Sequence, residues 1–94
     1  PNYIYARRHY LEGAKLENGE AQHRLANLLA LGKGGPQDVV TAYMWSNISL
    51  LILAKNSIVT SFRENLANIM TPAEISEAQR RARVCMASNY QDCG

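Results

Sequence analysis

Apolar side chains recur at helical spacing along most of this chain. Residues 3–17 carry an apolar stripe formed by Tyr3, Ala6, Tyr10 and Ala14. Residues 20–31 carry a second stripe formed by Ala21, Leu25, Leu28 and Leu29. Because positions three and four residues apart share one face of an α-helix, both segments are predicted to be amphipathic helices.

Three further helices are predicted downstream. The third begins at Asp38, whose carboxylate suits the exposed first-turn amides, ends near Lys55-Asn56, and has a stripe of Ala42, Trp45, Ser49 and Ile52. The fourth runs over residues 57–70, with an inward set of Ile58, Phe62, Leu66, Ile69 and Met70. The fifth starts at Thr71-Pro72, with Glu74 placed to close a capping box, and buries Ile75, Ala78, Ala82 and Cys85.

Glycine-containing breaks and an internal spacing indicate how these helices are arranged. Asn18-Gly19 is predicted to stop the first helix, and the glycines and proline of residues 32–36 cannot continue the second. Ala6 and Ala42 lie 36 residues apart, and each is followed by an aromatic residue three or four positions later. Short helix pairs with such a period are typical of solenoids. We therefore predict an all-α fold, an α-α superhelix (solenoid) of antiparallel helix pairs with about five helices.

Length and charge exclude several classes of protein. The 94 residues make a single domain, and a net charge of +2 is too weak to indicate a nucleic-acid partner. The dense basic cluster of Arg80, Arg81 and Arg83 follows Glu77 on the same helix, so we expect a solvated face. The longest uncharged run, residues 39–54, would be a helix of about 24 Å, shorter than the ~30 Å hydrocarbon core of a bilayer. No membrane span is predicted.

The residues that usually carry chemistry are not grouped in catalytic or ligating patterns. His9 and His23 have no metal-ligand spacing, and we expect His9 to be a packing residue and His23 a surface residue. The glycines at 32, 34 and 35 lack the Gly-Lys-Ser/Thr sequence of a phosphate-binding loop. No nucleophile-elbow motif accompanies the serines. We therefore expect no metal, no cofactor and no enzymatic activity.

The two cysteines leave two interpretations open. Cys85 lies near the end of the last helix and Cys93 lies in the polar tail, so the tail is long enough to fold back and form one disulfide. Such a bond would stabilise the fold by roughly 2.5 kcal/mol. The other interpretation is a buried free Cys85 with an exposed free Cys93. We favour the disulfide, and hence a periplasmic or secreted location, with a cytoplasmic location as the alternative.

Residues 21–45 read A-Q-x-x-L-A-x-x-L-x-x-G-x-G-G-P-Q-D-x-x-x-A-Y-x-W, which closely resembles the Sel-one-like repeat, a relative of the tetratricopeptide repeat. In that family an Ala and a Leu pack the first helix, a Gly-x-Gly turn follows, an Asp starts the second helix, and an Ala and a Trp dock it. Here the resemblance gives these structural roles to Ala21, Leu25, Gly32, Gly34, Asp38, Ala42 and Trp45.

The resemblance also divides the chain into parts of a single domain, 1–94. A half repeat covers 1–19, with Asn2 in the aspartate position; a full repeat covers 20–55; and a C-terminal closing helix pair of the type seen in bacterial members covers 56–94. Departures from the family pattern are Glu17, Ala26, Leu29 and Gly35. Because Glu17 stands where a glycine would end the helix, Gly19 is expected to provide the stop.

The resemblance implies a scaffold or adaptor for protein–protein interaction. The concave face of such a domain is lined by first helices, and the residues of the full repeat that lie off its packing stripe are His23, Arg24, Asn27, Leu28 and Leu31. These are predicted to bind a peptide or protein partner, unless the two leucines pack on the preceding helix instead. The alternatives are a terminal cap of a longer solenoid and a hydrolase, since relatives have been linked to hydrolysis.

Overall fold

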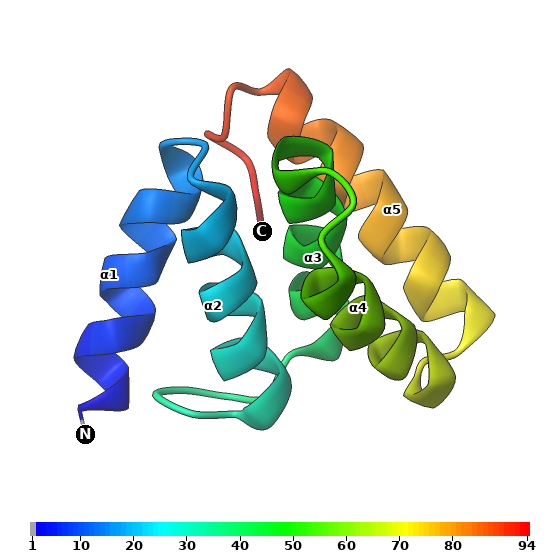
Figure 1. Ribbon diagram of the computed structural model, residues 1–94, viewed down its shortest axis with the longest axis horizontal. Helices are drawn as coiled ribbons and strands as arrows, with labels where there is room; N and C mark the ends of the chain where they lie inside the picture. Colours follow the sequence, from blue (N-terminus) through cyan, green and yellow to red (C-terminus); the bar gives the residue numbers. More distant parts are fainter. Residues whose placement is uncertain (1) are drawn as a thin grey trace.

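The computed structural model describes residues 2–94, and this part of the chain folds into five α-helices without strands, as predicted for an all-α protein. The helices are α1 (Tyr3–Lys15), α2 (Gly19–Leu31), α3 (Val39–Leu53), α4 (Ser57–Ile69) and α5 (Pro72–Ala87). Short connections join them, and the residues after α5 turn back toward α2 and α3 (Figure 1).

Each of the five helices begins after a residue whose side chain accepts a hydrogen bond from a first-turn amide. Two of these caps were predicted. Asp38 accepts from the Thr41 amide at 3.0 Å, and Thr71 and Glu74 form the full capping box with Pro72 in the first turn. Such caps satisfy amides that have no partner within the helix. The other caps are Asn2, Asn18 and Asn56.

The predicted end of the first helix was wrong. Asn18-Gly19 does not stop α1 but starts α2, with Asn18 as its cap and Gly19 as its first residue. The reversal occurs at Glu17, which has a left-handed backbone with φ of 65°. The amide of Asn18 bonds to the Gly13 carbonyl and the amide of Glu17 to the Ala14 carbonyl, which is the Schellman arrangement. Glu17 therefore adopts the conformation that a glycine usually provides.

The turn after α2 uses glycines as predicted. Gly32 and Gly34 have φ of 66° and 79°, a region that L-residues with side chains rarely adopt. A Cβ on Gly34 would also collide with the backbone of Tyr3, so this turn lies directly against the start of α1. Arg7 strengthens the same contact, because its guanidinium donates to the carbonyl of Pro36 at 2.9 Å.

Helix α3 is the centre of the molecule. It packs against α2, α4 and α5, whereas α1 packs closely only on α2 (Figure 1). This arrangement explains the long uncharged run, because a helix with neighbours on several sides is apolar all round. Within residues 2–94, no helix is both long enough and apolar enough to cross a membrane.

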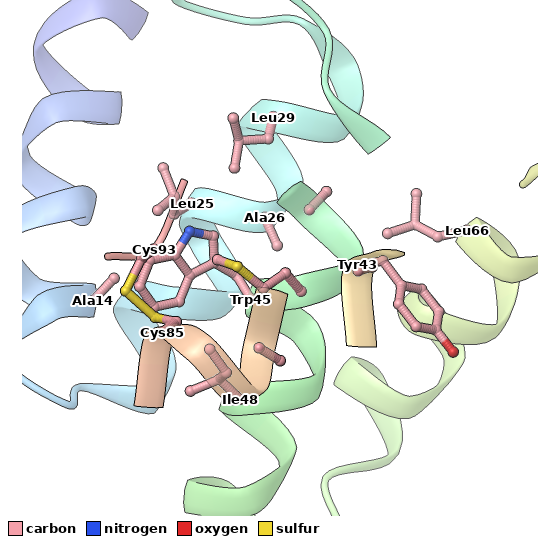
Figure 2. Close-up of a cluster of buried hydrophobic side chains, with 14 of the residues drawn as sticks. Ala14, Leu25, Ala26, Leu29, Tyr43, Trp45, Ile48, Leu66, Cys85 and Cys93 are labelled. Atoms are coloured by element: carbon pink, nitrogen blue, oxygen red, sulfur yellow. A yellow bond between two sulfur atoms is a disulfide. The ribbon is translucent and has the colours of Figure 1, made fainter. Parts of the chain in front are cut away.

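The core contains three of the seven predicted repeat residues: Leu25, Ala42 and Trp45. Figure 2 shows the indole of Trp45 beside the Cys85–Cys93 disulfide, while Tyr43 points to the opposite side of α3, toward Leu66. Leu25 and Ala42 are buried in the same cluster, and Ala21 is partly buried against α1. The disulfide was the favoured interpretation of the two cysteines and is confirmed, so the chain has no free thiol.

Three isoleucines predicted to face inward are exposed instead. Ile52 is 41% exposed, Ile58 is 71% exposed and Ile69 is 69% exposed. In α4, Leu66, Met70 just after the helix and the partly buried Phe62 face the core as predicted, and Val59 is buried in place of Ile58. In α3 the predicted Ala42, Trp45 and Ser49 are buried and so is Ile48, whereas Ile52 lies in the last turn of the helix. Helix α3 also ends at Leu53, two residues before the predicted end.

Candidate partner-binding groove

A groove of about 420 Å³ lies between α1, α2 and the start of α4. We call it the α1–α2–α4 groove. Helix α2 contributes Glu20, His23, Arg24, Asn27 and Leu28, and the other two helices contribute Tyr3, Ala6, Tyr10, Asn56, Ile58 and Val59. Its base is aliphatic and its edges carry amides, phenols and one ion pair. This composition is typical of a site that binds an apolar side chain and fixes its surroundings by hydrogen bonds.

Four of the five predicted partner-binding residues line this groove. His23, Arg24, Asn27 and Leu28 occur together there, but Leu31 does not and is 59% exposed outside it. The two leucines lie three positions apart on the same helix face, and their environments differ because α2 ends at Leu31. Leu28 is buried at the base of the groove, whereas Leu31 is the last residue of the helix and is exposed.

The roles expected for the two histidines are reversed. His9 is exposed, and its ring lies near that of its neighbour Tyr10, so it is not a core packing residue. His23 is half-buried, and its ring meets Phe62 of α4 edge to face with 5.3 Å between centroids. Its Nδ1 atom is buried and has no hydrogen-bond partner among the described residues. His23 therefore joins α2 to α4 at the inner wall of the groove.

The charges along the groove compensate one another. The Arg24 Nε atom lies 3.0 Å from the Glu20 carboxylate, an exposed i,i+4 pair on α2. Burial lowers the pKa of His23 below its usual value, with a smaller effect of Arg24 in the same direction and an opposing effect of Glu20. The imidazole is therefore neutral at pH 7, and the groove presents no net charge to a partner.

The contribution of α4 and of the tyrosines to this site was not predicted. Asn56 caps α4 through its side chain and also lines the groove with Val59. The 36-residue spacing between Ala6 and Ala42 provides a signal for these positions. Asn56 lies 36 positions after Glu20, and Val59 lies 36 positions after His23. The same spacing therefore relates the start of α2 to the start of α4.

The remaining clusters have ordinary structural explanations. In the described part of the chain, no three His, Cys, Asp or Glu side chains lie close enough to hold a metal ion. Arg80 and Arg81 both bond to the Glu77 carboxylate at 2.8 Å, as predicted for this helix face. The two arginines hold the pKa of Glu77 at about 2.

Comparisons of the chain with protein-family models, with curated proteins and with solved structures gave no significant match. The similarity to the Sel-one-like repeat therefore rests on the residues themselves.

Proposed function

We propose that this domain is a protein-interaction module of the Sel-one-like repeat type that binds a peptide or protein segment in the α1–α2–α4 groove. The observation that carries this proposal is the gathering of His23, Arg24, Asn27 and Leu28 in one hollow with residues of α1 and α4. In this interpretation α2 and α4 are the first helices of successive pairs, and the groove is a short concave surface of a solenoid.

The chemistry of the groove suggests the kind of segment that it binds. Leu28 and Val59 form an aliphatic base, while Asn27 and Asn56 place amides at the edge. Because Glu20 and Arg24 already neutralise each other and His23 is uncharged, the groove favours an uncharged partner. We propose a peptide with one or two aliphatic side chains between uncharged polar residues.

Matching caps support the proposed repeat. Asn2 accepts a hydrogen bond from the Tyr5 amide at 3.0 Å, and Asp38 accepts from the Thr41 amide at the same distance. The two caps stand 36 residues apart, as do Ala6 and Ala42. The same local structure thus begins α1 and α3, as expected if both are second helices of repeats.

One observation favours the alternative that this piece caps a longer solenoid. Ile4 and Tyr5 project from α1 and are exposed, although α1 packs closely only on α2. Apolar residues on such a face suit stacking against another helix pair. Further repeats upstream in the reading frame would favour this alternative. In either case, the Cys85–Cys93 disulfide supports our proposal of a periplasmic or secreted location.

Selection from a random peptide library displayed on phage tests the groove directly. Selected peptides are measured by calorimetry against the wild-type protein, Ile58→Asp and Ile69→Asp. Both isoleucines are exposed on α4, but only Ile58 lines the groove, so Ile69→Asp is a matched control. We expect Ile58→Asp to weaken binding about tenfold or more, since it places a charge in an uncharged apolar site. Equal affinity for both variants would reject this groove as the binding site.

A further inference from the structure

The segment after α5 covers the only tryptophan of the chain. We call residues 88–94 the tail. The ring of Tyr90 lies parallel to the indole of Trp45, with 5° between the planes and 6.4 Å between centroids. Trp45 is 1% exposed, and Cys93 is buried beside it. The tail thus forms part of the core although it has no regular secondary structure beyond a turn.

The tail lies on a different side of α1 and α2 from the α1–α2–α4 groove. Residues 91–94 of the tail line a second hollow of about 430 Å³, whose walls are Arg7, Leu11 and Lys15 of α1, Leu25 and Leu29 of α2, and Asp38, Thr41 and Trp45. No residue is shared between the two sites. The tail therefore occupies the region between α1 and α3, two helices that do not pack closely on each other.

Among the described residues, packing attaches the tail to this surface, and no hydrogen bond joins it to α1, α2 or α3. Its hydrogen bonds connect residues 84–92 with one another, such as the Tyr90 amide to the Cys85 carbonyl at 2.8 Å. The tail meets α3 through the Tyr90 ring and the buried Cys93, both beside Trp45, and its covalent connection is the disulfide from Cys93 to Cys85 of α5. In addition, Asn89 and Tyr90 both have left-handed backbones, with φ of 59° and 66°. For a residue as large as tyrosine this conformation is unfavourable, so it opposes docking when the disulfide is absent.

From these contacts we infer that the tail is a thiol-controlled cover, which the Cys85–Cys93 disulfide holds closed over Trp45 and which a dithiol reductant opens. A thiolate of the reductant attacks the Cys93 sulfur, because Cys85 is fully buried while Cys93 is slightly exposed. The Cys85 sulfur leaves and takes up a proton. The second thiol of the reductant then resolves the mixed disulfide, which releases Cys93 as a thiol and the reductant as its own disulfide.

The size of the effect follows from chain entropy. The disulfide closes a loop with a sequence separation of 8. When the disulfide is reduced, this loop is no longer closed. The equilibrium between docked and undocked tail then shifts roughly 70-fold toward the undocked tail. Helices α2 and α3 keep their mutual packing and their caps in the reduced protein. Reduction is therefore expected to be a local opening rather than unfolding.

Hydrogen exchange and fluorescence quenching test this inference on the full chain. The oxidised protein, the same sample reduced with dithiothreitol, and Cys93→Ser are compared by mass spectrometry of exchanging amides and by acrylamide quenching of Trp45. We expect the Tyr90 amide to exchange roughly 70-fold faster in both thiol forms, with a higher quenching constant for Trp45 and unchanged protection in α2 and α3. The matched control is Gln91→Ala, which alters an exposed tail residue and leaves the disulfide and the ring contact in place.

Two results would overturn the inference. If Trp45 stays shielded after reduction, the ring contact alone keeps the tail docked and the disulfide controls nothing. If α2 and α3 lose protection together with the tail, the disulfide maintains the whole fold instead of closing a cover. Since Cys93→Ser could fail to fold for reasons of its own, reduction of the already folded wild-type protein, followed by circular dichroism, decides between local opening and unfolding.

Discussion

Gly13 of α1 and Ala21 of α2 face each other so closely that a Cβ added to Gly13 would lie 2.8 Å from the Cβ of Ala21. This distance is shorter than carbon atoms in contact normally adopt, so the two helices approach at a point where one side chain is missing. Glycine inside a helix costs about 1 kcal/mol relative to alanine. Its presence here is explained by the close approach of α1 and α2.

Gly13→Ala is therefore expected to destabilise the protein by about 1–2 kcal/mol, although alanine is the better helix former. The double variant Gly13→Ala/Ala21→Gly moves the methyl group to the other helix and should regain most of the loss. Urea unfolding followed by circular dichroism gives the free energies of unfolding. Additive effects of the two substitutions would show that these positions do not meet.

Glu17→Gly is expected to stabilise the protein by about 0.5–1 kcal/mol, because Glu17 has a φ of 65° and glycine adopts this region without a steric cost. The equivalent helix ends after α2 and α5 use Gly32 and Asn89, residue types that tolerate this conformation better. Glu17→Ala separates the effect of charge from that of the backbone. If Glu17→Ala stabilises the protein as much as Glu17→Gly does, the left-handed backbone at this position is not the reason.

Acidification should weaken the fold through His23. Burial lowers the pKa of His23 in the folded protein below the value of 6.5 that applies to the unfolded chain. The unfolded chain then binds more protons below about pH 6.5, so the free energy of unfolding decreases as the pH falls through that value toward the folded pKa. Glu77, with a pKa of about 2, loses its contribution only at lower pH, below about 4.5.

Urea titrations at pH 7.5 and pH 5 measure this effect. His23→Gln should lose less stability between the two values than the wild-type protein, because it cannot take up the proton. His9→Gln serves as the control, since His9 is exposed on α1. If both variants follow the wild-type protein, His23 does not contribute to the pH dependence.

Asp38→Ala should reduce the free energy of unfolding by about 1–2 kcal/mol, because the carboxylate accepts from both the amide and the hydroxyl of Thr41 at the start of α3. Asp38→Asn keeps an acceptor for the amide, so its loss should be smaller. Thermal unfolding of the three proteins decides the order. If Asp38→Asn is no more stable than Asp38→Ala, the lost cap is not the cause of the destabilisation.

Local chemistry explains which parts of the fold were predictable. The caps Asp38 and Thr71 were found because acceptor and donor lie within three residues of each other. The first buried residue of α4 was not, because Ile58 and Val59 are both at helical spacing from Phe62 and Leu66, and only packing against α3 selects Val59. His23 was misplaced for the same reason, since its burial depends on Phe62 of α4, 39 positions later.

The candidate site was predictable on one helix only. The residues of α2 assigned to the partner-binding face could be read from the sequence of that helix, and four of the five do line the groove. The opposite wall required knowledge of how α4 is placed relative to α2, which depends on the connection through α3. Helical spacing within α2 indicated which of its faces lines the groove, but it did not indicate that α4 forms the opposite wall.

The central position of α3 also has a consequence for how this sequence can vary. Eight of its side chains are buried, among them Ser46 and Ser49, whose hydroxyls bond to the carbonyls of Ala42 and Gly19. Neighbours on several sides leave little room for larger or more polar replacements. Random mutagenesis should thus find few accepted changes in α3 and many at the exposed Ile69 of α4, which lies outside the groove, so that α3 would diverge most slowly among descendants of the sequence.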